Sequence, residues 1–214
     1  MFKILWPFVV IIPLIVPMPI VLLVLTILII ISPIIMFRYS HQKKVFLKRT
    51  DVKWWVSTIF TLGLICTLGL FFATCKGIIY RGNILRFSFW LINVGLLLHL
   101  HSLLTLKQMF HAEPAILERQ TIVSDGPYQL VRHPIYLAYI LLHLGMSLTT
   151  GRVFIGLLLT TPTVFWAIQR AMLEETLLAD GETKDSYLSY ASSTPMLFPT
   201  ARSIIRFLQK TYGS

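Results

Sequence analysis

The stretch GPYQLVRHPIY, residues 126–136, lies directly before an apolar segment, and RAMLEE, residues 170–175, closes the apolar segment after it. Only Gly151 and Arg152 separate the two segments, residues 135–150 and 153–173, which predicts a tight antiparallel helical hairpin. A hairpin returns the end of its second helix to the start of its first. The two charged stretches are therefore predicted to meet at one end of the hairpin, although they lie far apart in the chain.

Composition places the chain in a membrane. Hydrophobic residues make up 56% of its 214 residues and charged residues 13%, whereas soluble chains carry about 25% charged residues. The formal net charge of +10 arises from Lys and Arg in short loops, which is typical of membrane topology signals and contacts with anionic lipid. Nucleic acid is excluded as a partner because no long basic face or soluble domain is available to bind it.

Five apolar stretches are long enough to be considered as transmembrane helices. The fold class is therefore an all-α integral membrane protein with about five spans, at residues 19–37, 54–73, 87–106, 135–150 and 153–173. Six Lys and Arg residues follow the first span, between residues 38 and 53. The positive-inside rule then places this loop, residues 107–134 and the C-terminal tail in the cytoplasm.

The first charged stretch has the features of an anion site. Pro134 is suited to the first position of a helix and leaves His133 near the N-cap. The exposed N–H groups of that helix start, together with Arg132 and His133, favour a negatively charged ligand. Tyr128 and Tyr136 add flat apolar surface with a hydroxyl group.

The second charged stretch places Arg170 and Glu174 on one helix face, with Glu175 one position further round. Either stretch alone could be ordinary: an arginine that reaches the membrane surface, or a solvated pair of glutamates. Both stretches on one short hairpin favour a functional site, because charges at that depth are expensive unless they are paired or functional.

Other polar residues give weaker signals. His99 and His101 fall on nearly opposite faces of a helix, so no metal site is predicted. Asn93, His99 and His143 are interpreted as contacts between packed helices, and Trp166 as a packing or interfacial residue. No G-x-G sequence follows a strand, which disfavours a Rossmann nucleotide site.

Three blocks resemble the isoprenylcysteine carboxyl methyltransferases and the related membrane phospholipid methyltransferases. The pattern G-P-Y-x-x-x-R-H-P-x-Y is complete at 126–136, and R-x-x-x-E-E-x-x-L at 170–178. Tyr187 and Tyr190 keep the Y-x-x-Y spacing, and Pro195 and Pro199 the P-x-x-x-P end. The Phe-Gly that precedes the tyrosines in the family is absent, replaced near residues 183–184.

This resemblance implies S-adenosyl-L-methionine as methyl donor, bound at the cytoplasmic face and covered by the C-terminal tail. It divides the chain into N-terminal anchor spans, residues 1–107, and a catalytic half, residues 108–214. It also implies two sets of site residues. The expected catalytic residues are Arg132, Arg170 and Glu174, and the expected cofactor-binding residues are His133, Tyr136, Glu175, Tyr128, Tyr187 and Tyr190.

The acceptor is expected to be lipophilic, most simply the carboxylate of a prenylated cysteine or a similar lipid. A phospholipid amine is the alternative acceptor, and it would require a base. Two other classes remain: an NADPH-dependent membrane sterol or steroid reductase, which also carries R-H-P-x-Y, and a non-catalytic membrane scaffold. The sequence does not indicate the oligomeric state.

Overall fold

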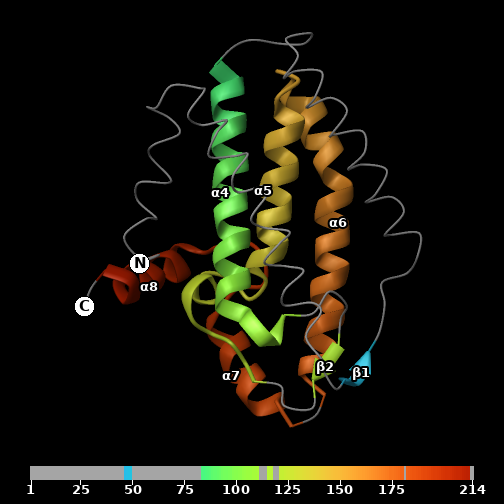
Figure 1. Cartoon of the computed structure of the whole chain (residues 1–214), viewed down its shortest axis with the longest axis vertical. Coiled ribbons are helices and arrows are strands. Elements are labelled where there is room, and N and C mark those ends of the chain that lie inside the picture. The colour runs from blue at the N-terminus through green and yellow to red at the C-terminus, as the bar shows by residue number, and fades with distance from the viewer. Residues whose placement is uncertain (1–45, 50–82, 111–114, 118–120, 181, 213–214) are drawn as a thin grey trace.

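The computed structural model describes residues 46–49, 83–110, 115–117, 121–180 and 182–212. Its centre consists of three long helices that lie side by side (Figure 1): α4 (Asn83–Leu106), α5 (Pro134–Leu148) and α6 (Val153–Leu178). Two shorter helices follow, α7 (Lys184–Ser193) and α8 (Ala201–Tyr212). Single 3-10 turns, η1 (Lys107–Met109) and η2 (Gly126–Gln129), lie between α4 and α5. The described part is thus almost entirely helical, as predicted.

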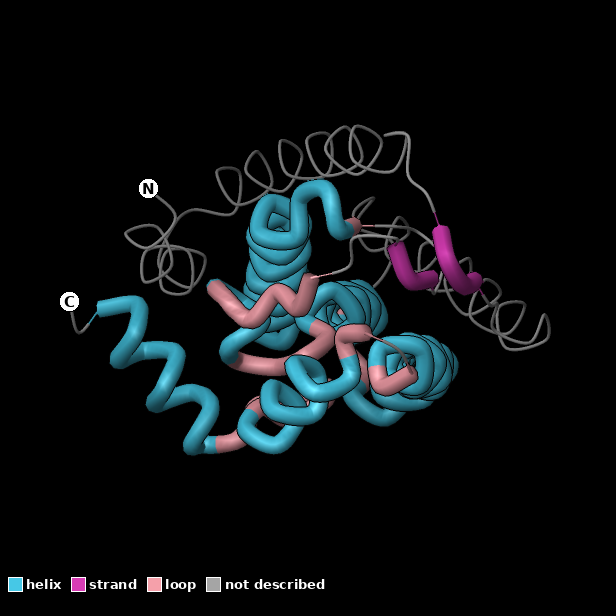
Figure 2. Tube along the Cα trace, turned by 90° about the horizontal axis from the view of Figure 1, so that it is seen from below, coloured by secondary structure: helices cyan, strands magenta, loops and turns pink. Residues whose placement is uncertain are grey.

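A two-stranded antiparallel sheet is the exception to the all-α prediction. Strand β1 (Phe46–Arg49) pairs with β2 (Ala115–Leu117), and the register is irregular between Phe46 and Lys48. Figure 2 shows both strands at the edge of the helical bundle. Strands of three or four residues are too short to show an alternating apolar pattern, so no sequence pattern predicts them.

Two of the described helices, α4 and α6, are long and apolar enough to cross a membrane, judged by length and composition. Helix α5 is apolar but has only 15 residues, fewer than the roughly 20 that a span requires. The predicted spans at residues 19–37 and 54–73 lie outside the described residues. The five-span topology and the division at residue 107 therefore stay predictions.

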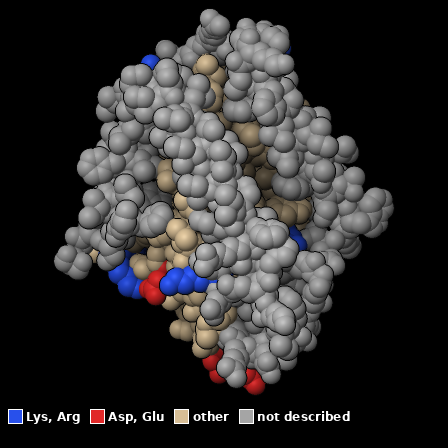
Figure 3. All heavy atoms as spheres, in the orientation of Figure 1, with Lys and Arg blue, Asp and Glu red and all other residues tan. Residues whose placement is uncertain are grey.

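Helix α6 exposes a surface suited to lipid. Phe154 is 78% exposed, and Leu157, Leu158 and Met172 are each more than half exposed. An exposed apolar surface of this kind marks a site of contact with a membrane or with another protein. On the face shown in Figure 3, the charged side chains of described residues gather at the upper end and in the lower half of the molecule.

The connection between α5 and α6 is short because Gly151 turns the chain sharply. Its φ of +74° lies in the left-handed region that glycine adopts without strain. Its N–H donates to the carbonyl of Leu148 at 2.9 Å, and the Thr150 hydroxyl donates to the carbonyl of Ser147 at 3.0 Å. These bonds satisfy carbonyl groups at the end of α5. Helix α6 continues through Pro162 and past residue 173 to Leu178.

Helices α4 and α5 approach closely where Gly145 faces α4. A Cβ atom at Gly145 would lie 2.8 Å from the carbonyl oxygen of Ser88 and 2.7 Å from Cγ1 of Ile92. Small residues permit this kind of backbone contact between membrane helices. Around it, the apolar contact between the two helices is formed by Phe89, Ile92, Leu96, Leu100, Leu142 and Met146.

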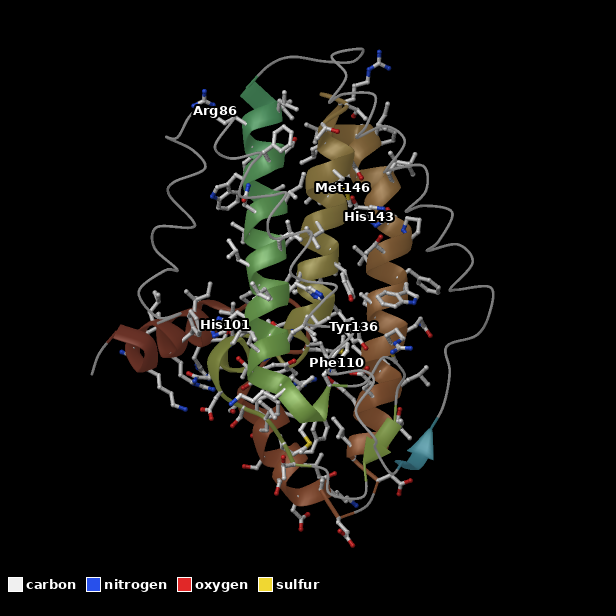
Figure 4. All side chains as sticks on the ribbon, in the orientation of Figure 1. Arg86, His101, Phe110, Tyr136, His143 and Met146 are labelled. Atoms are coloured by element: carbon white, nitrogen blue, oxygen red, sulfur yellow. The ribbon has the colours of Figure 1, made fainter. Side chains whose placement is uncertain are left out.

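Helices α5 and α6 are joined by a polar contact between His143 and Thr163, both buried. Figure 4 shows His143 between these helices, well above Tyr136. Other buried hydroxyl groups, including those of Ser102 and Thr160, donate to the carbonyl four residues earlier in their own helix. These hydrogen bonds lower the cost of placing the hydroxyl groups in an apolar environment.

The Gly145→Ala variant is expected to destabilise the bundle. The added methyl group meets backbone as well as side-chain atoms, so α4 and α5 must separate, at a cost of about 1–3 kcal/mol. The measurement is the thermal unfolding midpoint of the detergent-solubilised protein.

Gly156→Ala is the matched control, because its closest neighbour is the flexible end of Leu148, with Cδ2 at 2.7 Å. Its midpoint should fall less. Equal midpoints for Gly145→Ala and the wild type would show that the close helix approach does not limit stability.

Candidate functional site

The start of α5 is fixed by an extended backbone segment from the C-terminal tail. The N–H of Arg132 donates to the carbonyl of Pro195 at 2.8 Å, and the N–H of His133 to that of Met196 at 3.1 Å. Pro134 occupies the first turn of α5 and His133 is the N-cap, with φ −123° and ψ 65°. This non-helical backbone is what a residue before proline is expected to adopt. The tail therefore reaches the mouth of the hairpin.

Glu175 connects this mouth to the end of α6. Its two carboxylate oxygens accept from Nε of Arg132 at 2.8 Å and from Nη2 at 3.0 Å. Nε2 of His133 lies 3.0 Å from Oε1 of the same carboxylate. The Arg132 side chain is 14% exposed, His133 7% and Glu175 21%. Burial of these charges is tolerated because each is paired and hydrogen-bonded.

Arg132 is engaged on its other side by the tail. Its Nη1 donates to the carbonyl of Thr194 at 2.6 Å and to that of Ala191 at 3.1 Å. One guanidinium group thus ties the start of α5, the end of α6 and the end of α7 together. These contacts favour a positioning role for Arg132 over direct contact with an acceptor.

Glu174 forms a second set of contacts beside the first. It accepts from the hydroxyl of Tyr136, and Nδ1 of His133 lies 3.4 Å from its Oε2. Nη2 of Arg170 is 4.0 Å from Oε1 of Glu174, and Nε of Arg170 donates to the Tyr136 hydroxyl at 3.4 Å. Figure 4 shows Tyr136 at the lower end of α5 beside α6. His133 therefore faces one glutamate with each ring nitrogen.

Aromatic rings line the apolar side of this cluster. The rings of His133 and Tyr136 stack at 5.6 Å, and Tyr136 meets Trp166 edge-on, also at 5.6 Å. The Arg170 guanidinium carbon lies 5.8 Å from the centre of the Trp166 ring, in a cation–π contact. Trp166, predicted to be a packing or interfacial residue, is thus in direct contact with two members of the cluster. The four-residue spacing of Trp166, Arg170 and Glu174 could have assigned it to the same helix face.

Three tyrosines border the cluster from η2 and α7. The Tyr190 hydroxyl donates to the carbonyl of Tyr128 at 2.5 Å, which joins α7 to η2. Tyr187 is 4% exposed, and its hydroxyl has no hydrogen-bond partner among the described residues. Burial, with Glu175 nearby, raises the pKa of Tyr187, so it remains protonated at neutral pH. The Tyr187 hydroxyl is therefore buried beside Glu175 and Arg132, with which it interacts without forming a well-aligned hydrogen bond.

The structure thus brings six of the predicted residues into one connected cluster and places the other three at its border. The cluster consists of Arg132, His133, Tyr136, Arg170, Glu174 and Glu175. Backbone carbonyls of Ala191 and Thr194, which sequence reasoning missed, are also part of it. No side-chain pattern signals carbonyl groups, so only the folded structure could reveal them.

His133 is expected to make stability depend on pH. Burial alone would lower its pKa, but hydrogen bonds and charge interactions with Glu174 and Glu175 raise its pKa above the ordinary 6.5. A raised pKa means that the protonated form stabilises the fold. This contribution is complete below pH 6.5 and disappears as the pH rises through the raised pKa.

The test compares the unfolding midpoints of the wild type and His133→Gln from pH 6.5 upward. The difference between them should shrink as the pH rises. A difference that stays constant over this range would contradict a protonated His133.

Comparison with known proteins bears on the same region. Residues 84–181 match the sequence model of the phospholipid methyltransferase family. No curated protein matches the chain. The matched residues include all of α4 except Asn83, the whole of α5 and α6, and every predicted site residue except Tyr187 and Tyr190. The match confirms the resemblance that the sequence blocks indicated: this segment is similar to the phospholipid methyltransferases.

Proposed function

We propose that this protein transfers a methyl group from S-adenosylmethionine to the carboxylate of a lipophilic acceptor, such as a prenylated cysteine. The carrying observation is the cluster around His133, in which three cationic side chains (Arg132, His133 and Arg170) face two carboxylates. With His133 protonated, the cluster has an excess of one positive charge, which favours an anionic acceptor. We place the site at the cytoplasmic face, from the basic loop at residues 38–53.

The donor fits the residues at the border of the cluster. Two buried side-chain atoms there lack partners among the described residues: the Tyr187 hydroxyl and Oε1 of Gln129, the residue after Tyr128. S-adenosylmethionine carries an ammonium group, ribose hydroxyls and an adenine amine that can satisfy such atoms. When bound, it supplies the methyl group from its sulfonium. The rings of Tyr136, Tyr187 and Tyr190 provide apolar surface for the adenine.

The protonation state of the cluster distinguishes the two candidate acceptors. A carboxylate needs no proton removed, only a cation to orient it, and Arg170 is suited to this because it lies beside Tyr136 and Trp166. An ammonium group must first lose a proton. His133 is a poor base, since both of its nitrogens face glutamates that favour its protonated form. Glu174 and Glu175 are weak bases as well, because each already accepts hydrogen bonds, from Tyr136 and from Arg132. The site therefore supports a carboxylate acceptor.

A phospholipid amine is the second candidate, and the description of the matching family favours it. Glu174 and Glu175 could then attract the cationic headgroup. The family match favours both methyl-transfer proposals over the sterol-type reductase and the non-catalytic scaffold. In either proposal the exposed apolar surface of α6 supports entry of a lipid tail from the bilayer.

Methyl transfer assays with labelled donor should separate these acceptors. We expect turnover of a farnesylated cysteine with a free carboxylate, and little turnover of phosphatidylethanolamine. Shortening the tail should lower the activity about fourfold for each methylene removed, because burial of one methylene contributes about 0.8 kcal/mol.

The pH dependence gives an independent reading of the same assay. Turnover of an amine acceptor should rise with pH, because only the neutral amine reacts, whereas that of a carboxylate should stay level or fall as His133 loses its proton. Turnover of the amine alone, rising with pH, would replace the carboxylate proposal by the phospholipid one.

Tyr187→Phe is expected to weaken donor binding with little loss of stability. The change removes a hydroxyl that lies beside Glu175 and Arg132 but forms no well-aligned hydrogen bond among the described residues. Donor affinity should fall about 2- to 10-fold, equivalent to one neutral hydrogen bond of about 0.5–1.5 kcal/mol. Calorimetric titration of S-adenosylmethionine measures it.

Tyr190→Phe is the matched control. It removes the bond to the Tyr128 carbonyl and should lower the unfolding midpoint. Unchanged donor affinity in Tyr187→Phe would remove this tyrosine from the donor site, and absence of any donor binding by the wild type would contradict the proposed function as a whole.

A further inference from the structure

Helix α8 has three different faces. Ser203 and Phe207 are buried against the rest of the protein. On one side of this docked face lie Ile204, Ile205 and Leu208, which are 41%, 55% and 46% exposed. On the other side, the four-residue spacing aligns the basic residues Arg202, Arg206 and Lys210. The apolar and basic faces are nearly opposite one another.

The helix is well defined at its start and contains no acidic residue. Thr200 and Ser203 exchange hydrogen bonds, from the Ser203 N–H to Oγ1 of Thr200 at 3.2 Å and from the Thr200 N–H to Oγ of Ser203 at 3.0 Å. This reciprocal pattern resembles a capping box. Lys210 contacts Asp125 at 3.1 Å, but both side chains are more than half exposed, so the contact neutralises little of the basic face.

The orientation of α8 differs from that of the spanning helices. Its axis crosses the direction of α4, α5 and α6 and extends sideways from the bundle near the lower end of α4, in both Figure 1 and Figure 2. A bilayer crossed by α4 and α6 has its surface near the ends of these helices. Helix α8 therefore has the position of a helix that lies in this surface.

We infer that α8 lies in the plane of the bilayer surface and binds anionic phospholipid. Ile204, Ile205 and Leu208 enter the boundary between headgroups and acyl chains, and Arg202, Arg206 and Lys210 contact anionic headgroups. Strong segregation of apolar and basic side chains is the feature by which interfacial helices bind membranes. The charge complementarity selects a bilayer with anionic lipid as the occupant, because a protein surface would leave one of the two faces unmatched.

Helix α8 packs directly against η2, whose Tyr128 carbonyl accepts from Tyr190. A helix held in the bilayer surface therefore supports η2, which borders the charged cluster. The membrane contact of α8 does not depend on which reaction the cluster performs.

The first experiment measures the depth of α8 in nanodiscs that hold one copy of the full chain. Cys66 and Cys75 are replaced by Ala, and a fluorophore is attached at Ile205→Cys or, as the matched polar position, at Gln209→Cys. A quencher on the lipid acyl chain should quench the label at position 205 more than the label at position 209. Iodide in the water should quench the label at position 209 more than the label at position 205. Equal quenching at both positions by each quencher would overturn the inference.

The second experiment tests the basic face. In the wild type, replacing part of the phosphatidylcholine with phosphatidylserine should increase acyl-chain quenching at position 205. The double variant Arg202→Gln, Lys210→Gln should lose this response. Each charge removed should lower the ratio of membrane-bound to released helix about fivefold. Lys184→Gln, in α7, should keep it. No response of the wild type to phosphatidylserine, or the same response in the double variant, would contradict binding to anionic lipid.

Discussion

The carboxylate of Glu175 is the point on which the arrangement of the site depends. It accepts two hydrogen bonds from Arg132 and contacts His133, so one group at the end of α6 fixes two consecutive residues before α5. None of these three side chains is well exposed, and each would be costly to bury alone. Removal of one partner would leave a buried charge without compensation, which is a larger loss than the pair contributes when intact.

The other segments are ordered around this interaction. Because Arg132 also donates to the carbonyls of Ala191 and Thr194, the guanidinium group that Glu175 holds also positions the end of α7. The backbone bonds from Arg132 and His133 to Pro195 and Met196 then direct the chain toward α8. The short turn at Gly151 supplies the remaining constraint, because it keeps α6 beside α5. Hairpin, tail and cluster therefore form one interdependent unit.

Much of this unit can be predicted from the sequence, and there are physical reasons why the rest cannot. Apolar length and the N-cap pattern at Pro134 predict α5 and α6, and the resemblance adds Tyr187 and Tyr190. The sequence does not show that Arg132 rather than Arg170 pairs with Glu175, because both arginines are within reach of a glutamate. The pairing is decided by the carbonyls of the tail, which no side-chain pattern reports. The β1–β2 pair escapes prediction because its residues are few and far apart in the chain.

The position of the cluster along α6 suits the two chemically different ligands of the proposed reaction. Toward its start the helix exposes apolar side chains, Phe154 above all, and toward its end it carries Arg170, Glu174 and Glu175. A lipid tail is stabilised only by the first environment and a charged donor only by the second. Trp166 and Tyr136 lie where these two environments meet. Both present apolar ring faces, and the Tyr136 hydroxyl donates a hydrogen bond to Glu174. A polar donor and a lipophilic acceptor can be held together only at such a boundary, because either ligand would be strongly disfavoured if it moved wholly into the environment of the other.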